Sequence, residues 1–300
     1  MIFTKMTNLE QYKGLTVLNK GNTSIKKAQK LGYIVKTNLQ AHIINNIENL
    51  EKEFLENKLV DKINIKGNSK LGEIPSISFP NIFLQQQFLI VVINNPKLKK
   101  MKIIRILFDY FQNNKVCVNC EGCFGGCYNN YDLNQYSNKG ISDLRSLLAF
   151  ITNREELFIS LYNKIRVYNI FRINSNGEIH NKELLDFYIK LAEKCKKTTF
   201  YTYTKSYQLF ENFLEDENKL PKNFILNISV FGNKEKVDKF ELINKTFNKF
   251  ITLDKEKFDK MVKNKEIKKS RICKGDCMEC DLCQKRLPKS NNKIYCCKHI

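Results

Sequence analysis

The chain has 300 residues, which is enough for one large domain or two of ordinary size. Hydrophobic residues make up 42% of the chain, and this fraction excludes wholesale disorder. Two features stand out, a net charge of +20 and a total of 11 cysteines.

No targeting or membrane-spanning segment is expected. Residues 1–14 lack the apolar core of a secretory signal. The most apolar run, 82–93, contains three glutamines and is much shorter than the roughly 20 residues that span a bilayer. We therefore expect a soluble, cytoplasmic protein without membrane contact. In that reducing compartment clustered cysteines are metal ligands more often than disulfides.

The first third of the chain is predicted to begin with a helical extension. Apolar side chains recur every three or four residues between 41 and 55, the pattern of an amphipathic helix. Residues 63–80 are expected to be extended, because glycines and prolines punctuate them. A strand is predicted at 88–93, and a strand or a short helix at 101–111.

The remainder alternates between helix and strand. Helices are predicted at 141–165, 182–195, 206–214 and 237–250, and strands at 167–173, 198–204 and 224–231. This spacing predicts an α/β fold with a parallel sheet and right-handed crossovers, arranged as a partial (β/α) barrel.

Three regions follow from this pattern. We expect a helical extension over 1–60, an α/β partial barrel over 61–254 and a basic, Cys-rich metal-binding tail over 255–300. The tail contains 14 Lys or Arg against 6 Asp or Glu, so its charge is concentrated. The remaining positive charge is spread out and indicates little about a site.

The first group of cysteines is compact and contains glycines. Its members are Cys117, Cys120, Cys123 and Cys127. Cysteines two or three residues apart can direct their thiolates at one metal from a single loop, and glycine permits the sharp turns. We expect a metal here, and both zinc and iron–sulfur clusters accept thiolate ligands.

The second group lies in the tail. It comprises Cys273, Cys277, Cys280, Cys283, Cys296 and Cys297, followed by His299. We expect a closed site with four or more protein ligands, in which Cys277, Cys280 and Cys283 take part and the other four compete for the remaining positions. The site would hold zinc or an auxiliary iron–sulfur cluster. Cys195 stands alone, and we interpret it as a small core residue.

The first group is expected at the reactive edge of the sheet. Sites in parallel α/β sheets lie at the carboxyl ends of the strands. Cysteines 117–127 would follow one strand, and Gly177 and Glu178 would follow the next, so both would lie at the same edge. Lys205 and Ser206 end a further strand there.

This arrangement resembles radical S-adenosylmethionine enzymes. In that class three cysteines hold a four-iron (4Fe–4S) cluster, and a Gly-Gly-Glu-like segment binds the amino group of the cofactor. The resemblance implies roles in cofactor binding for Gly177, Glu178, Arg172, Lys205 and Ser206. It also implies an electron donor as partner. The common spacing of the class is Cys-x3-Cys-x2-Cys, and the first group instead has gaps of two, two and three residues.

The chain resembles a smaller family more closely still, the "gene product 88" proteins of phages and mobile elements. The similar stretches are Gly67-Asn68-Ser69-Lys70, Ser78-Phe79-Pro80, Cys123-x3-Cys127-Tyr128, Phe171-Arg172-Ile173 with Gly177-Glu178, and Phe200 to Ser206. Asn223 to Ser229 and the cysteines at 277, 280 and 283 with His299 continue the pattern. This resemblance covers roughly residues 62–300. It supports the α/β fold and metal binding more than it supports a particular reaction.

Several of these residues have structural alternatives. Glu178 could cap the helix that follows, Ser206 could be a helix N-cap, and Arg172 could be a solvated charge at a strand end. His180 is interpreted as a surface residue. Tyr201 and Tyr203 share a face, and core packing is the favoured interpretation.

Two hypotheses about function remain. In the first, the chain is an iron–sulfur enzyme resembling the radical S-adenosylmethionine class, with an unknown substrate. In the second, it is a non-catalytic, metal-stapled nucleic-acid-binding protein of a mobile element, whose basic tail contacts phosphates. The sequence lacks a Walker-type phosphate loop and a His-Glu-x-x-His motif, so it gives little support for nucleotide hydrolysis or zinc proteolysis.

Overall fold

The computed structural model describes residues 23–32, 34, 37–67, 71–117, 133, 138–216, 219–230, 247–288 and 291–297. Within them the chain has the predicted α/β fold, built on one six-stranded sheet. Its strands are β1 (Ser76–Ile77), β2 (Ile170–Ile173), β3 (Thr199–Thr204), β4 (Phe224–Val230), β5 (Asn248–Leu253) and β6 (Lys293–Cys297). They lie in sequence order and all neighbours are parallel, which is the strand order of part of a (β/α) barrel.

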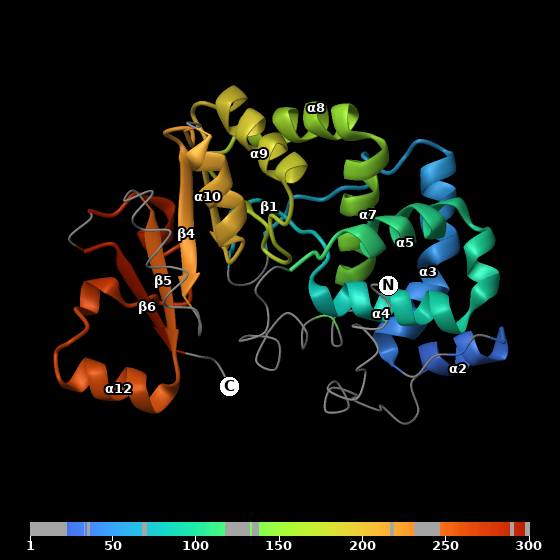
Figure 1. The fold of residues 1–300 in the computed structure, drawn as a ribbon, viewed down its shortest axis with the longest axis horizontal. Coiled ribbons are helices and arrows are strands. Elements are labelled where there is room, and N and C mark those ends of the chain that lie inside the picture. Colours follow the sequence, from blue (N-terminus) through green and yellow to red (C-terminus); the bar gives the residue numbers. More distant parts are fainter. Residues whose placement is uncertain are drawn as a thin grey trace.

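Nine α-helices are described. They are α2 (Thr23–Lys30), α3 (Asn38–Leu55), α4 (Ile82–Asn94), α5 (Lys102–Asn113), α7 (Asn138–Thr152), α8 (Arg154–Ile165), α9 (Lys182–Lys194), α10 (Tyr207–Glu215) and α12 (Lys255–Lys263). Short 3-10 helices are η2 (Pro96–Lys100), η4 (Lys269–Arg271) and η5 (Leu282–Gln284). Helices α2 to α5 gather at one end of the molecule, and β5, β6 and α12 lie at the other (Figure 1). None of the described helices is long and apolar enough to cross a membrane.

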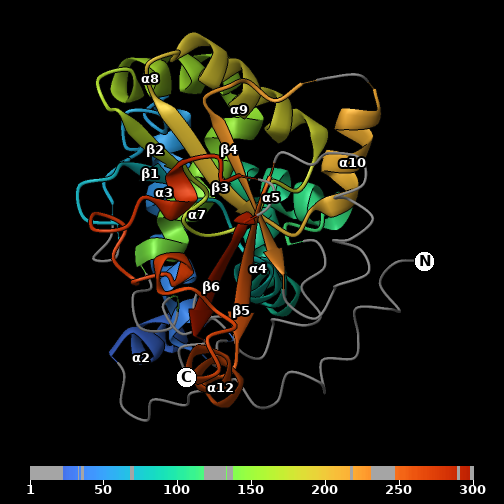
Figure 2. The same ribbon diagram turned by 90° about the vertical axis from the view of Figure 1, so that its left-hand side faces the viewer.

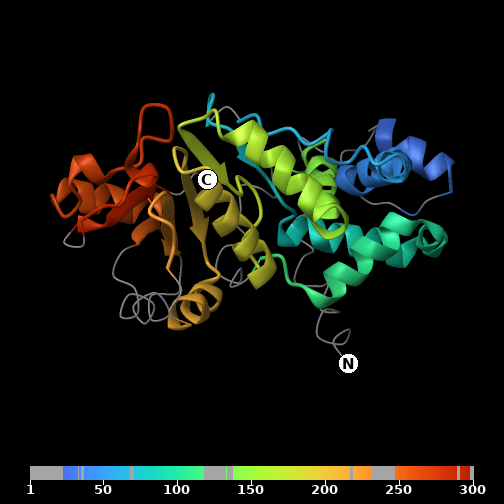
Figure 3. The same ribbon diagram turned by 90° about the horizontal axis from the view of Figure 1, so that it is seen from above.

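The two faces of the sheet have different neighbours, because alternate residues of a strand point to opposite sides. Phe171, Phe200 and Phe224 belong to the main hydrophobic core, which they share with α9 and α10. Tyr201 on the opposite face packs in a small cluster with the C-terminal segment. Figure 2 looks onto this second face with the C-terminal segment in front, and Figure 3 shows the sheet between that segment and the helices.

Helices α4 and α5 occupy the chain between β1 and the first cysteines. The prediction of a strand at 88–93 is therefore wrong, and of the two alternatives for 101–111 the helix is correct. Helix α4 is apolar on most sides because other helices surround it. Its Gln85 is fully buried, and the side-chain amide donates to the carbonyl oxygens of Phe111 and Asn114 at 2.8 and 2.7 Å.

The other predicted elements fit the structure to different degrees. Helix α9 and strands β3 and β4 lie within one or two residues of their predicted bounds. The predicted helix at 141–165 is two helices, which meet at Asn153. The prediction of a helix to residue 250 is wrong at its end, because β5 begins at Asn248; residues 231–246 lie outside the described part. The Cys-rich segment ends in β6 and so completes the sheet.

A close contact between two loops sets the edge of the sheet where a site was predicted. Gly177 follows β2 and has a φ of +77°. A Cβ at this position would lie 2.5 Å from the Phe79 carbonyl oxygen and 2.9 Å from that of Pro80. Only glycine therefore lets the loop after β2 pack against the loop after β1.

Replacement of Gly177 by alanine should lower the free energy of unfolding by about 3 kcal/mol or more. Alanine is strained at this positive φ, and the clash of its Cβ with the loop after β1 adds a second cost. Urea unfolding measures the effect. Gly275→Ala is the matched control, since Gly275 has a φ of +83° but nothing within 4 Å of the added Cβ. It should cost only about 1 kcal/mol. Equal losses for the two variants would contradict the close packing.

Candidate functional site at the carboxyl edge of the sheet

The Glu178 carboxylate lies buried at the carboxyl ends of β2 and β3. Its Oε1 accepts hydrogen bonds from the Ile179 amide at 3.0 Å and from the Thr204 hydroxyl at 2.8 Å. Its Oε2 accepts one from the Lys205 amide at 2.8 Å. One side chain thus joins the loop after β2 to the end of β3.

The alternative role of Glu178 as a helix cap is not what the structure shows. The N-cap of α9 is Asn181, whose side chain accepts from the Leu184 amide at 2.9 Å. Ser206 does occupy the N-cap position of α10, but its side chain makes no capping hydrogen bond. Glu178 therefore lacks its alternative structural role, whereas Ser206 holds the N-cap position without the side-chain hydrogen bond of a cap.

Burial dominates the electrostatics of Glu178. Removal of the carboxyl group from water raises its pKa to about 7, although the hydrogen bonds from Lys205, Thr204 and Ile179 act in the opposite direction. Close to neutral pH this group exists in both protonation states. A carboxyl with such a pKa is typical of a functional site.

Several buried polar atoms near Glu178 have no hydrogen-bond partner. Ser206 is 2% exposed and its Oγ is unpaired, while its amide donates to Thr204 Oγ1, the hydroxyl that also contacts Glu178. In the loop that precedes Glu178, Asn176 Oδ1 and Asn174 Nδ2 are also buried without partners. Unpaired buried polar atoms are costly, so their accumulation at one edge indicates a place for a polar ligand.

Asp143 on α7 is a second buried acid at this edge, and sequence reasoning missed it. Its Oδ2 accepts from Asn176 Nδ2 at 2.5 Å. Burial raises the pKa of Asp143 to about 7, opposed by the charge of Lys139 and the Asn176 hydrogen bond. Its position four residues before Leu147, on the apolar face of the predicted helix, was the available signal.

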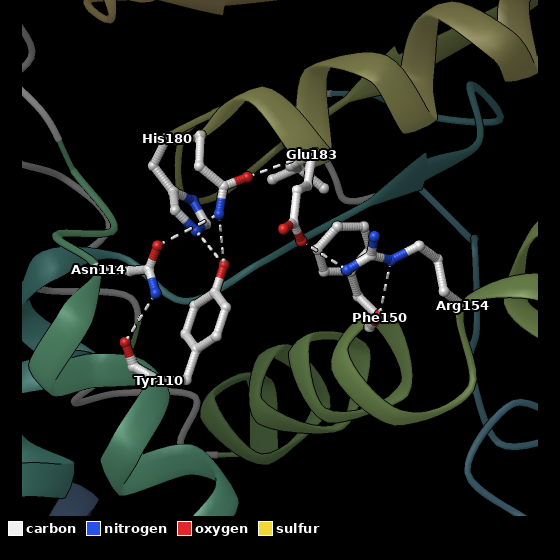
Figure 4. Close-up of polar contacts among 8 residues, drawn as sticks. Tyr110, Asn114, Phe150, Arg154, His180 and Glu183 are labelled. Atoms are coloured by element: carbon white, nitrogen blue, oxygen red, sulfur yellow. Dashed lines mark hydrogen bonds and ion pairs between the residues drawn. The ribbon is translucent and has the colours of Figure 1, made fainter.

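A polar network connects this loop to the helix that leads into the first cysteines (Figure 4). His180 Nε2 lies 2.7 Å from the Tyr110 hydroxyl of α5, and His180 Nδ1 lies 3.1 Å from the Glu178 carbonyl oxygen. Asn181 Nδ2 donates to the Tyr110 hydroxyl at 3.0 Å and contacts Asn114 Oδ1 at 3.3 Å. The interpretation of His180 as a surface residue is therefore wrong, and burial lowers its pKa to about 4.

The same close-up shows how α9 is tied to α7 and α8. Arg154 donates to Glu183 Oε2 at 2.6 Å, and its guanidinium carbon lies 4.5 Å from the centre of the Phe150 ring. This ion pair is largely exposed and contributes little to the free energy of unfolding, about 1 kcal/mol or less. We assign it no part in the site.

The first cysteine group begins close to the Glu178 loop. Cys117 is half-buried and follows Val116, whose amide donates to Gln85 Oε1 at 3.3 Å. Asn114, three residues before Cys117, contacts Asn181. The segment that carries the cysteines therefore leaves α5 beside the loop after β2. Cys120, Cys123 and Cys127 lie outside the described residues.

The second cysteine group lies against the other face of the sheet. Cys283 is buried, and Cys273 and Cys277 pack against the cluster that contains Cys283 and Tyr201. Cys296 is buried on β6, with Cys297 next to it; His299 lies outside the described residues. The described cysteines form no disulfide. Among described residues, no three His, Cys, Asp or Glu side chains are already placed as a metal ligand set. Cys195, as predicted, is a buried core residue.

Arg172 does not belong to the Glu178 edge. Its guanidinium carbon lies 4.2 Å from the centre of the Tyr203 ring and 5.3 Å from that of Tyr201. The interpretation as a solvated strand-end charge is wrong, because the side chain stacks on the face covered by the C-terminal segment. Arg172 thus belongs with the second cysteine group, while Gly177, Glu178, Lys205 and Ser206 lie together at the edge.

Two buried asparagines that sequence reasoning missed attach the C-terminal segment to the sheet. Asn227 Nδ2 donates to the carbonyl oxygens of Thr202 and Cys283, at 3.1 and 3.0 Å. Asn248 Nδ2 donates to Asn227 Oδ1 at 3.0 Å and to the Lys285 carbonyl oxygen at 2.9 Å. An amide within a strand of mostly apolar residues was the available signal at Asn227.

Fold and site together define an α/β protein with a buried polar site at the carboxyl edge of a parallel sheet. The chain belongs to the Gene product 88 family, whose model matches residues 87–286. This match confirms the family resemblance drawn from the sequence motifs. No curated protein and no solved structure matches the chain significantly.

Asp143→Asn should change how stability depends on pH. The folded protein holds the Asp143 proton up to about pH 7, whereas the unfolded chain loses it near 3.8, so this group stabilises the wild type most at low pH. Between pH 5 and pH 7 the wild type should lose stability relative to the variant by up to about 1.4 kcal/mol per pH unit. Urea unfolding at pH 5, 6 and 7 tests this, with Asp186→Asn on α9 as the surface control. A difference that stays constant with pH would contradict a buried, protonated Asp143.

Proposed function

We propose that this protein is an iron–sulfur protein that binds S-adenosylmethionine at the carboxyl edge of β2 and β3, in the manner of radical S-adenosylmethionine enzymes. The observation that carries the proposal is the buried Glu178 carboxylate, together with unpaired buried polar atoms on Ser206 and in the loop that precedes Glu178. Its substrate is not specified by these residues.

The polar atoms at the edge fit the amino-acid part of this cofactor. An ammonium group offers three donors and needs acceptors. Glu178 accepts three hydrogen bonds, and a carboxylate has about four lone-pair positions, so Oε2 can accept one more. Asn176 Oδ1 and Ser206 Oγ can also accept. A bound ammonium would also favour the ionised form of the buried carboxylate.

The position of the first cysteines supports the same proposal. Cysteines of the group at 117–127 would hold the iron–sulfur cluster, and Cys117 enters this segment beside the Glu178 loop. When bound, such a cluster supplies the electron that starts radical chemistry on the cofactor. The protein residues would bind and orient the cofactor. Glu178 would bind its amino group, and the contact at Gly177 holds the loop after β2 in place.

Ser206→Ala and Glu178→Gln should both weaken binding of S-adenosylmethionine to protein that has been reconstituted anaerobically with iron and sulfide. Loss of one charged hydrogen bond at Glu178 predicts a decrease of about 10- to 100-fold, measured by equilibrium dialysis. Ser206→Ala should reduce binding with almost no loss of stability, because its Oγ has no partner in the protein.

Glu193→Gln, an exposed substitution at the end of α9, is the matched control and should bind like the wild type. Reconstituted wild type should also release deoxyadenosine from the cofactor under reducing conditions. A colourless protein that contains only zinc, or equal affinities for all three variants, would refute the proposal.

The second candidate function, nucleic-acid binding, rests on α12. This helix has no buried residue, and its Lys255, Lys257, Lys260 and Lys263 are all exposed. Deletion of residues 255–300 would be a poor test, because it removes β6 from the sheet. Substitutions on the surface of α12 leave the sheet intact.

Exchange of Lys257, Lys260 and Lys263 for glutamine should weaken binding to duplex DNA and reduce its salt dependence. Each lost phosphate contact lowers the slope of log affinity against log salt by about 0.9. Titrations at several salt concentrations measure this, with Lys190→Gln on α9 as one exposed control. An unchanged slope in the triple variant would remove the tail from consideration as a nucleic-acid interface.

A further inference from the structure

The second cysteine group lies at a defined place on the sheet. The turn that contains η5 contacts β3 and β4, and the Asn227 side chain holds the Cys283 carbonyl oxygen at 3.0 Å. Gln284 Nε2 donates to the Cys277 carbonyl oxygen at 2.9 Å, and the Cys273 amide donates to the Tyr295 carbonyl oxygen at 2.8 Å. Hydrogen bonds thus fix the backbone on both sides of these cysteines.

The structure separates the cysteines of this group into two sets. Cys273 and Cys277 pack against the small cluster that contains Cys283, and Cys280 lies between Cys277 and Cys283 with two residues on either side. Cys296 instead directs its thiol to the Cys297 carbonyl oxygen at 3.2 Å. Cys296 and Cys297 are also consecutive in a strand, so their side chains point to opposite faces and cannot both serve one site. The set around Cys283 has four members: Cys273, Cys277, Cys280 and Cys283.

This set has the chemistry of a closed metal site. Four thiolates satisfy the coordination of zinc or of a four-iron cluster completely. Between Cys273 and Cys283 the chain consists of turns and one short 3-10 helix, without a longer element of its own. No three of these described thiols already stand together as a ligand set, so we expect the metal to draw them together and order the segment.

Charge is the main obstacle to such a site. Four thiolates around Zn²⁺, or around a four-iron cluster with a charge of +2, leave a net charge of about −2 at one place. On a half-buried sheet face this charge needs a compensating cation. Arg172 is a cation on β2, and its guanidinium lies over the rings of Tyr201 and Tyr203, which pack in the small cluster that contains Cys283. The Tyr203 ring, 4.2 Å away, positions the guanidinium.

We propose that Cys273, Cys277, Cys280 and Cys283 form a four-thiolate metal site on the sheet face opposite the helices, and that Arg172, stacked on Tyr203, is the positioning residue that balances its charge. The bound species is a soft metal centre, either zinc or an iron–sulfur cluster. The inference goes beyond the proposed function and does not require a cofactor at the Glu178 edge.

The ligand set is tested in full-length protein in which Cys117, Cys120, Cys123 and Cys127 are replaced by serine. Any metal then reports on the second group alone, so failure here is distinguishable from failure at the first group. Metal and sulfide analysis after anaerobic purification distinguishes zinc from iron–sulfur. In this background Cys280→Ser should lose the metal, and Cys296→Ser should retain it. A background protein without metal, or equal loss in the two variants, would overturn the ligand assignment.

Arg172 is tested with Co²⁺ as the probe in the same background. Competition with a chelator gives the affinity, and the visible bands of Co²⁺ report thiolate coordination. Arg172→Met should weaken binding about 10- to 100-fold, the usual cost of losing an outer-sphere partner. Arg172→Lys, which keeps the positive charge, should recover part of the lost Co²⁺ affinity. If Met and Lys variants bind equally well, or both bind like the background protein, Arg172 does not balance charge. Unfolding of the metal-free variants separates this effect from a loss of fold.

Discussion

A buried carboxylate holds the carboxyl edge of this sheet together. Glu178 accepts hydrogen bonds from its own loop and from the end of β3, while Gly177 beside it packs against the loop after β1. Three neighbouring strand ends therefore depend on one short segment. The hydrogen bonds offset the cost of removing the carboxylate from water only in part, so its pKa stays raised. An edge with this residual cost is suited to a ligand that brings positive charge.

The face of the sheet that the C-terminal segment covers is held in part by polar and charged contacts. Phe171 and Phe200 face helices and pack without polar partners, whereas Arg172 and Tyr203 face the C-terminal segment. That segment packs on the sheet in a small apolar cluster, and the side-chain amides of Asn227 and Asn248 also attach it. Because attachment by hydrogen bonds leaves polar and charged groups between the segment and the sheet, this layer can hold a charged centre that an apolar core could not.

The sequence was informative where periodicity and burial agree. Helix α9 and strand β3 have clear patterns and polar boundaries, and both were predicted within one or two residues. The sequence of α4 predicts a strand at 88–93, and this is wrong because a helix buried on most sides shows no periodicity and its Ile and Val favour strands. The motif residues after β2 and β3 were placed correctly at one edge. Asp143 and Arg172 were not, since their environments depend on elements distant in the chain.

The pairing of β1 with β2 also has a consequence for the order of folding. Ser76 and Ser175, whose hydroxyls are in contact at the ends of these strands, are 99 residues apart in sequence, and α4, α5, α7 and α8 lie between them. Contacts that close so long a loop form late, because their entropy cost must be met before they stabilise anything. The sheet from β2 onward can assemble from local crossovers. The Gly177 contact, and with it the complete edge around Glu178, is then among the last parts of the molecule to form, so a partly folded chain lacks the completed edge.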